Sequence, residues 1–209
     1  MSLQRRPARS TDLAGLEALA LAQGGYFRRE DAIAHGITDR LLSYHKRTGR
    51  FDRVLPGVYR LTRAPVSPND ELLLAWVWSR YGGAISHESA LALYDLSDLL
   101  PSKVQLTVPV DERRRTARFD LHRSQLQPEE IRPYEGVSAT VPGRAIVDAA
   151  AGDADPEQIQ KAIRQALDRA LLTPERLRAA AARSRYRNKR AVQRLIEQTL
   201  GDVALGARR

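Results

Sequence analysis

The stretch between residues 12 and 61 limits the possible folds of this chain more than any other part of its sequence. Apolar residues recur there at three- and four-residue spacing in three short segments, which is typical of amphipathic helices. The segments cover residues 13–22, 29–35 and 38–48, and glycines follow each of them. Two β-prone runs, 51–55 and 58–61, then flank the turn dipeptide Pro56-Gly57. We therefore predict three helices followed by a β-hairpin, the element order of a winged helix-turn-helix domain.

The ends of these helices carry suitable capping residues. Asp12 and Thr38 precede the first and third helices, where a side-chain oxygen can accept a backbone N–H. Gly36 follows the second helix, where a left-handed C-cap favours glycine. The residues that we expect on or near the inner faces of the second and third helices are Ala32, Ile33, Leu41, Leu42 and His45.

The second half of the chain mixes strand and helix patterns. Alternating apolar and polar residues predict strands over 103–108 and 118–122, and a weaker strand over 137–140. We expect residues 109–116 to connect the first two strands, with Arg113-Arg114-Arg115 at the tip of a hairpin. Helices follow. Their first turns contain Pro142, Pro156 and Pro174, at positions where the missing N–H is harmless.

These patterns predict an α+β protein with two domains. The winged helix-turn-helix domain covers residues 1–64, and a mixed α/β domain with C-terminal helices covers residues 69–209. The segment between them, around Pro65 and Pro68, is expected to be a linker. A chain of 209 residues with 43% hydrophobic residues is long and apolar enough for two small cores.

The composition excludes several kinds of site. The chain has no cysteine, which excludes a disulfide scaffold, a thiolate zinc site and a cysteine nucleophile. It also lacks a Gly-rich phosphate loop, an HExxH motif and a G-x-S-x-G motif. We therefore predict no catalytic residue, no metal and no cofactor.

The apolar runs predict no membrane contact. None approaches the ~18 residues that a membrane-spanning helix needs. Arg5, Arg6 and Arg9 precede an apolar stretch, as in a signal peptide, but Asp12 and Glu17 interrupt it. We expect a cytoplasmic protein.

Positive charge is concentrated at the two ends of the chain. The formal net charge is +9, and 30 of the 34 basic residues are arginine. Residues 1–60 carry 11 basic and 6 acidic side chains, and residues 183–209 carry 8 and 2. The arginine excess has two interpretations, a GC-rich genome or the binding of phosphate and guanine, for which arginine is the better ligand. Positive charge that is concentrated in two segments favours binding surfaces over charge spread evenly for solubility.

The third helix and the hairpin carry the candidate DNA-binding residues. The second helix of a helix-turn-helix pair fits the major groove of B-DNA, and the wing contacts phosphates. The candidates are Thr38, Asp39, Arg40, Ser43, Tyr44 and Arg47 on the helix, and Arg50 and Arg53 on the wing. Arg50 and Arg53 are expected to contact phosphates rather than bases. Asp39 has a second interpretation, since a carboxylate in the first turn also complements the helix dipole.

A second basic segment lies near the C-terminus. Its candidate phosphate contacts are Arg183, Arg185, Arg187, Lys189 and Arg190, and Arg194 continues the run. A run of this kind is either a surface for nucleic acid or an acidic partner, or simply a solvated face. The sequence leaves both interpretations open.

Two other classes of function are alternatives. A nucleic-acid-processing enzyme could use His87, Glu88 and His122, and an RNA-binding module could use the arginines of residues 183–194. Against the enzyme, Ser86 is better explained as the cap of a helix that begins near His87. Asp148 lies four residues after Arg144, and this spacing predicts an ion pair.

Several short motifs resemble AbiEi-type antitoxins. In the first domain these are Gln23-Gly24-Gly25-Tyr26-Phe27, Gly36-Ile37-Thr38, Gly49-Arg50-Phe51 and Leu55-Pro56-Gly57-Val58-Tyr59-Arg60-Leu61. In the second they are Ile85-Ser86-His87-Glu88-Ser89-Ala90-Leu91, Leu106-Thr107-Val108-Pro109, Leu121-His122-Arg123 and Val147-Asp148. The resemblance covers roughly residues 10–185.

The resemblance implies a bacterial type IV toxin–antitoxin module. In that family the antitoxin represses its own operon through inverted repeats in double-stranded DNA. The toxin is a nucleotidyltransferase that acts as a functional partner without forming a stable complex with the antitoxin. Some longer relatives append an endonuclease-like domain, and since this sequence ends at Arg209 we expect no nuclease activity.

Overall fold

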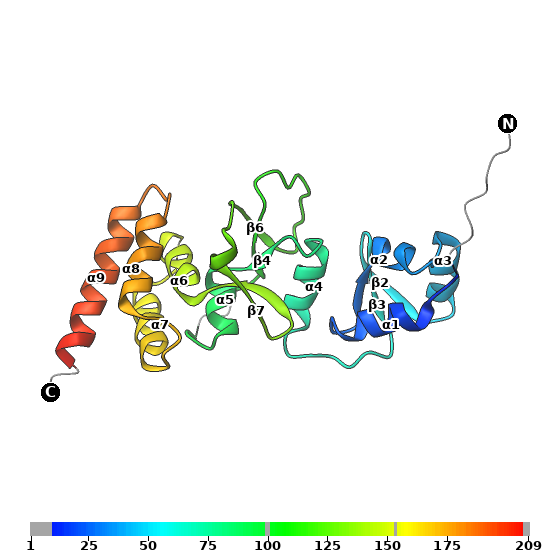
Figure 1. Cartoon of the computed structure of the whole chain (residues 1–209), viewed down its shortest axis with the longest axis horizontal. Helices are drawn as coiled ribbons and strands as arrows, with labels where there is room; N and C mark the ends of the chain where they lie inside the picture. Colours follow the sequence, from blue (N-terminus) through cyan, green and yellow to red (C-terminus); the bar gives the residue numbers. More distant parts are fainter. Residues whose placement is uncertain (1–9, 99–100, 153, 207–209) are drawn as a thin grey trace. The chain divides into compact units, whose positions relative to one another are not determined.

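The computed structural model describes residues 10–98, 101–152 and 154–206. The chain forms two compact units, one extending through Tyr81 and the other beginning at Gly82. Figure 1 colours the chain from blue at the N-terminus to red at the C-terminus. The two units are considered separately below.

The first unit contains the three helices and the hairpin in the predicted order, with an additional strand and a fourth helix. It consists of α1 (Leu13–Leu21), β1 (Tyr26–Arg28), α2 (Arg29–Ala34), α3 (Asp39–Arg47), β2 (Phe51–Leu55), β3 (Val58–Leu61) and α4 (Asp70–Trp78). Strands β2 and β3 form the predicted hairpin, and β1 pairs antiparallel with β3 to complete a sheet of order β1-β3-β2. Three helices and a three-stranded sheet therefore enclose one small core.

Aromatic residues dominate that core. Phe27 is fully buried, its ring centroid lies 4.9 Å from that of Phe51 in an edge-on arrangement, and it stacks on Tyr59 at 5.6 Å. Leu42 of α3 is also buried, as predicted. The prediction for Ile33 was wrong, because its side chain is 39% exposed. Helix α2 has only six residues, and Ala32 occupies its single buried position, so the next residue is rotated away from the core.

Both predicted N-caps are present, and Gly25 occupies a position that requires glycine. The Asp12 side chain accepts from the Gly15 N–H at 2.8 Å, and Thr38 accepts from the Leu41 N–H at 3.3 Å. Gly25 has a φ of +94°, and a Cβ at that position would lie 2.3 Å from the Cβ of Ala64. Only glycine fits between α1 and the sheet at this point.

Helix α4 belongs to the first unit. Its Asp70 accepts a hydrogen bond from the Tyr26 hydroxyl, and the hydroxyl of Tyr81 lies 2.7 Å from both Gln23 and Asp31. The compact unit therefore extends past the linker expected at residues 64–68. The predicted domain bounds of 1–64 and 69–209 remain a prediction, and their outer limits fall outside the described residues.

The second unit is built on a mixed five-stranded sheet of order β6-β5-β4-β8-β7. Its strands are β4 (Ala84–Ile85), β5 (Gln105–Val108), β6 (Asp120–Arg123), β7 (Ile131–Tyr134) and β8 (Val137–Thr140). Its helices are α5 (His87–Leu93), a short 3₁₀ helix η1 (Pro128–Glu130), α6 (Pro142–Ala151), α7 (Pro156–Asp168), α8 (Pro174–Arg183) and α9 (Lys189–Gly206). The last four helices pack against one another at the C-terminal side of this unit (Figure 1).

Two features of this sheet differ from the sequence predictions. Strands β5 and β6 pair in parallel, with Leu106 opposite Leu121, so the arginines at 113–115 are not at a hairpin tip. Parallel partners require a crossover that returns the chain to the same end of the sheet, and residues 109–119 supply it. The pattern also missed β7, which contains Pro133; proline is tolerated there because β7 is an edge strand.

The predicted fold class is confirmed. The chain is an α+β protein with a helix-and-hairpin unit followed by a mixed α/β unit that ends in helices. Pro142, Pro156 and Pro174 occupy the first turns of α6, α7 and α8, as predicted. None of the helices in the described ranges is long and apolar enough to cross a membrane.

Candidate nucleic-acid interface

One face of α3 is polar, basic and exposed. Arg40, Ser43, Tyr44 and Arg47 follow the i, i+3, i+4, i+7 spacing that places side chains on a single helix face, and all four are exposed. Leu42 anchors the opposite side of the helix in the core with 2% exposure. Within the described residues, Arg40, Ser43 and Arg47 have no hydrogen-bond or ion-pair partner. This face is therefore free to bind a ligand.

A tight turn sets the position of α3 after α2. Gly36 has a φ of +75°, which ends α2, and Ile37 is buried between the two helices. The two predicted contact residues at the start of α3, Thr38 and Asp39, are exposed. Thr38 already caps the helix through its hydroxyl.

Asp39 has a partner that the sequence did not indicate. Its Oδ1 accepts from the Arg29 Nε at 2.7 Å, and Arg29 is the first residue of α2. The pair lies at the surface beside α3, and it holds the pKa of the Asp39 carboxyl below its usual range. Arg29 therefore joins the candidate interface. No local motif could have found it, because the pair joins two helices.

The two predicted wing residues differ in their surroundings. Arg53 lies in β2 opposite Tyr59, exposed and without a charged partner in the described part of the chain. Arg50 lies in the connection between α3 and β2, and its Nε is 3.6 Å from Glu17 Oε1. The charge of Arg50 is thus partly offset by α1, whereas the charge of Arg53 is not.

The basic segment of the second unit spans the end of α8, the turn that follows and the start of α9. Arg183, Arg185, Arg187 and Arg190 are exposed, whereas Lys189 is half-buried and donates from Nζ to the Ala182 carbonyl. Arg183 and Arg185 line a pocket together with Tyr186. Arg190 and Arg194 lie along a separate groove of α9 beside Glu197.

The residues of the enzyme alternative are only partly brought together. The rings of His87 and His122 stack with centroids 3.6 Å apart. His87 has a φ of +53°, in the left-handed region that a histidine seldom adopts. Within the described residues, no hydrogen bond or ion pair joins Glu88 to either ring. The expectation for Ser86 was wrong in detail: it occupies the N-cap position of α5, but its Oγ lies 2.9 Å from His87 Nδ1 rather than on a backbone N–H.

The environment of these histidines disfavours their charged forms. Burial lowers the pKa of His87 to about 3, with further contributions from His122 and Arg144. Burial also lowers the pKa of His122. Both rings are thus neutral near pH 7. In addition, no group of three or more histidine, aspartate or glutamate side chains in the described ranges could hold a metal ion.

We expect the His87 imidazole to remain neutral when the pH is lowered from about 8 to about 5, because its low pKa places protonation below this range. An NMR titration of the four histidine ring signals measures this directly, and His87→Asn assigns the signal while tolerating the left-handed backbone. In urea all four signals should titrate near the ordinary pKa of ~6.5. A His87 midpoint close to that value in the folded protein would contradict the prediction.

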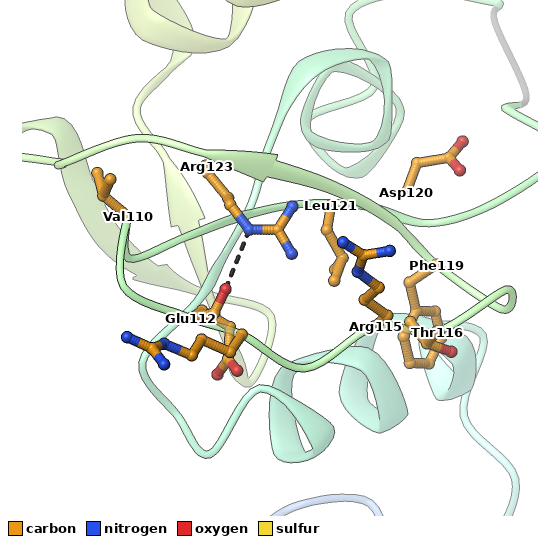
Figure 2. Close-up of a pocket in the computed structure, with 9 residues that line it drawn as sticks. Val110, Glu112, Arg115, Thr116, Phe119, Asp120, Leu121 and Arg123 are labelled. Atoms are coloured by element: carbon orange, nitrogen blue, oxygen red, sulfur yellow. Dashed lines mark hydrogen bonds between the residues drawn. The ribbon is translucent and has the colours of Figure 1, made fainter.

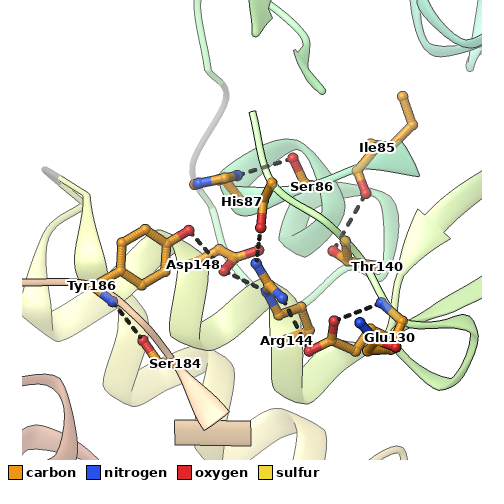
Figure 3. Close-up of polar contacts among 11 residues, drawn as sticks. Ile85, Ser86, His87, Glu130, Thr140, Arg144, Asp148, Ser184 and Tyr186 are labelled. Atoms are coloured by element: carbon orange, nitrogen blue, oxygen red, sulfur yellow. Dashed lines mark hydrogen bonds and ion pairs between the residues drawn. The ribbon is translucent and has the colours of Figure 1, made fainter. Parts of the chain in front are cut away.

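Arg144 and Asp148 form the predicted ion pair at the centre of a larger network (Figure 3). Arg144 Nε donates to Asp148 Oδ1 at 2.7 Å, and Arg144 Nη1 lies 3.0 Å from Glu130 Oε1. The Tyr186 hydroxyl also donates to Asp148 Oδ1, at 2.9 Å. Burial raises the pKa of Asp148 to about 6, although Arg144 and Tyr186 favour its charged form.

The comparisons with known proteins bear on the first unit. Residues 16–62 match the family model described as "Transcriptional regulator, AbiEi antitoxin". This segment runs from α1 to the end of the β2–β3 hairpin and includes all of α3. Residues 16–62 form an AbiEi-type regulator domain. The family supports a role as a regulator or antitoxin for this part of the chain.

Beyond this AbiEi-type domain, the comparisons concern the fold. The structure is similar to the crystal structure of the RV2827C protein from Mycobacterium tuberculosis, with a TM-score of 0.55 and 15% identity. The similarity covers 91% of this chain and 80% of that chain, so it includes the second unit as well as the AbiEi-type domain. No curated protein matches this chain by sequence.

Proposed function

We propose that the protein is a DNA-binding transcriptional autorepressor and the antitoxin of a bacterial type IV toxin–antitoxin module. The observation that carries the proposal is the face of α3 formed by Arg40, Ser43, Tyr44 and Arg47. It lies within the segment that matches the AbiEi family model, and nothing in the described structure covers it.

The chemistry of this face suits the major groove. Arginine can donate two hydrogen bonds to O6 and N7 of guanine, and serine can donate or accept at any base. Tyr44 is 49% exposed and offers both a ring and a hydroxyl. Thr38 lies at the N-terminus of α3, where helix-turn-helix proteins contact bases. We assign Asp39 to the interface through its ion pair with Arg29, which places a guanidinium beside α3.

The wing and the second basic segment suit phosphates. Within the described residues, Arg53 on the hairpin has no acidic partner, and Glu17 offsets the charge of Arg50 only in part. Contacts of this kind set affinity and register without reading sequence. In the second unit we assign the same role to Arg183, Arg185, Arg187, Lys189 and Arg190. The target is double-stranded DNA with an inverted repeat, since two copies of one recognition helix read two half-sites.

A reporter assay tests this function in cells. The gene's own promoter is fused to a reporter, the protein is supplied from a second plasmid, and the adjacent nucleotidyltransferase gene is induced separately. The proposal expects both a fall in reporter expression and rescue of growth. Unchanged reporter expression would contradict the repressor role, and unrescued growth would contradict the antitoxin role.

Arg53→Ala should weaken binding to operator and random duplex about equally and reduce the salt slope by roughly one, because Arg53 acts on phosphate. Binding measured across a salt series checks this. Arg164→Ala is the matched control: it removes one exposed arginine from α7 and should leave the slope unchanged. An altered sequence preference for Arg53→Ala at an unchanged slope would instead assign Arg53 to base readout.

A further inference from the structure

The second unit contains a pocket, and the proposed function uses only the outward-facing charge of Arg183 and Arg185 in its lining. Its volume is about 830 Å³, within the range of ~300–1,000 Å³ that small-molecule sites occupy. The walls come from β6, the loop after it, α6 and the end of α8 with its following turn. Four separate segments, at residues 110, 121–130, 144–147 and 180–186, thus meet around one cavity within a single unit.

The charge on the pocket walls is positive and largely uncompensated. Arg183 and Arg185 line the pocket and have no polar partner in the described part of the chain. Arg123 donates from Nε to the Glu112 carbonyl at 3.0 Å (Figure 2). It also donates from Nη2 to the Arg114 carbonyl at 3.3 Å. These backbone bonds orient the Arg123 guanidinium without neutralising it. Three arginines therefore present charge to a ligand.

Arg144 lies in the same wall but has a different role. Its guanidinium is held by Asp148 and Glu130 (Figure 3) and by the Ser124 hydroxyl, and its side chain is only 14% exposed. Asp148 and Glu130 raise its pKa further despite burial. The Arg144 guanidinium is thus fixed in the wall and stays charged, and the carboxylates of Asp148 and Glu130 offset its charge.

One buried polar atom of the pocket lacks a partner. His122 lines the cavity, and its Nε2 is buried without a hydrogen bond. A buried polar nitrogen without a partner costs free energy unless something else satisfies it. The Tyr186 hydroxyl and the Ser124 and Ser184 hydroxyls lie in the same walls, together with the apolar side chains of Val110, Leu121, Val147 and Ala180. The cavity therefore combines cationic, hydrogen-bonding and apolar surface.

We propose that this pocket binds a small organic phosphate monoester, with the phosphate held by Arg183, Arg185 and Arg123 and the organic part directed toward His122. Arginine pairs give phosphate oxygens strong, charge-assisted hydrogen bonds. A phosphate of duplex DNA is a diester fixed on a convex surface, whereas this cavity is concave and is lined in part by His122, whose Nε2 is buried. The apolar side chains in the wall favour a ligand with an organic part, a phosphate monoester, over inorganic phosphate.

Calorimetric titration of the full-length protein tests the proposal. The probes are ribose 5-phosphate, adenosine monophosphate, inorganic phosphate and a short random DNA duplex. At least one monoester should bind at least about tenfold more tightly than inorganic phosphate. Arg183→Ala/Arg185→Ala should weaken that binding at least about tenfold, since both side chains are exposed and their removal leaves the fold intact.

Two controls keep the test decisive. Arg164→Ala removes an exposed arginine outside the pocket and should leave monoester affinity unchanged. The His122 ring signal, followed by NMR, should shift on monoester addition and should not shift with the duplex. The proposal is overturned if no monoester binds more tightly than inorganic phosphate, if the double variant binds as well as wild type, or if the duplex alone shifts His122. These outcomes are independent of operator binding through α3.

Discussion

Replacement of Arg40, Ser43, Tyr44 and Arg47 by alanine should abolish the preference of the protein for its own promoter. The four side chains occupy one exposed face of α3, and each true base contact contributes ~1–3 kcal/mol of discrimination. Removal of two such contacts lowers specificity about 30-fold or more. Residual binding to any duplex should persist, because the wing and the second basic segment are intact. A gel-shift competition between promoter and scrambled duplex measures the ratio of affinities.

Lys46→Ala is the matched control for this variant. Lys46 is exposed on the same helix but falls outside the i, i+3, i+4, i+7 series of the other four residues. Its loss should reduce affinity for both duplexes without changing their ratio. Promoter selectivity that survives the fourfold replacement would show that another surface reads the operator.

A protein that ends at Tyr81 should bind the operator weakly, without cooperativity, and should fail to rescue cells that express the neighbouring toxin. It retains one recognition helix and the wing, but it lacks the basic segment and the whole α/β unit. The truncation is placed after Tyr81 because a protein that ended at residue 64 would lack α4 and with it Asp70, the hydrogen-bond partner of Tyr26. Growth during co-expression and a binding isotherm on the operator measure the two effects.

The reciprocal variant completes this test. Arg40→Ala/Arg47→Ala should lose repression yet still rescue growth, because the second unit is unchanged. Rescue by the protein that ends at Tyr81 would overturn this division of labour. Failure of Arg40→Ala/Arg47→Ala to rescue growth would also overturn this division of labour.

Local signals were sufficient to predict the first unit. The spacing of Leu41 and Leu42, the Thr38 cap and the Pro56-Gly57 turn are each encoded within a few residues, and the structure confirms the helices and hairpin that they predicted. Ile33 was misplaced because a helix of six residues has room for one buried position, and hydrophobicity alone does not say which residue takes it.

Long-range features could not be predicted in the same way. The parallel pairing of β5 with β6 depends on a crossover rather than on either strand's own pattern. The ion pair of Arg29 with Asp39 joins α2 and α3, and the stack of His87 on His122 joins residues 35 positions apart. The Arg144–Asp148 pair was predictable because both residues lie one turn apart on one helix.

The ratio of affinities for the promoter and for a scrambled duplex of equal length and composition tests the central claim most directly. The full-length protein is titrated against both duplexes at one near-physiological salt concentration, since affinities depend steeply on salt. If the α3 face reads an operator, the promoter should bind at least ~10³-fold more tightly. Equal affinity for the two duplexes would contradict the claim.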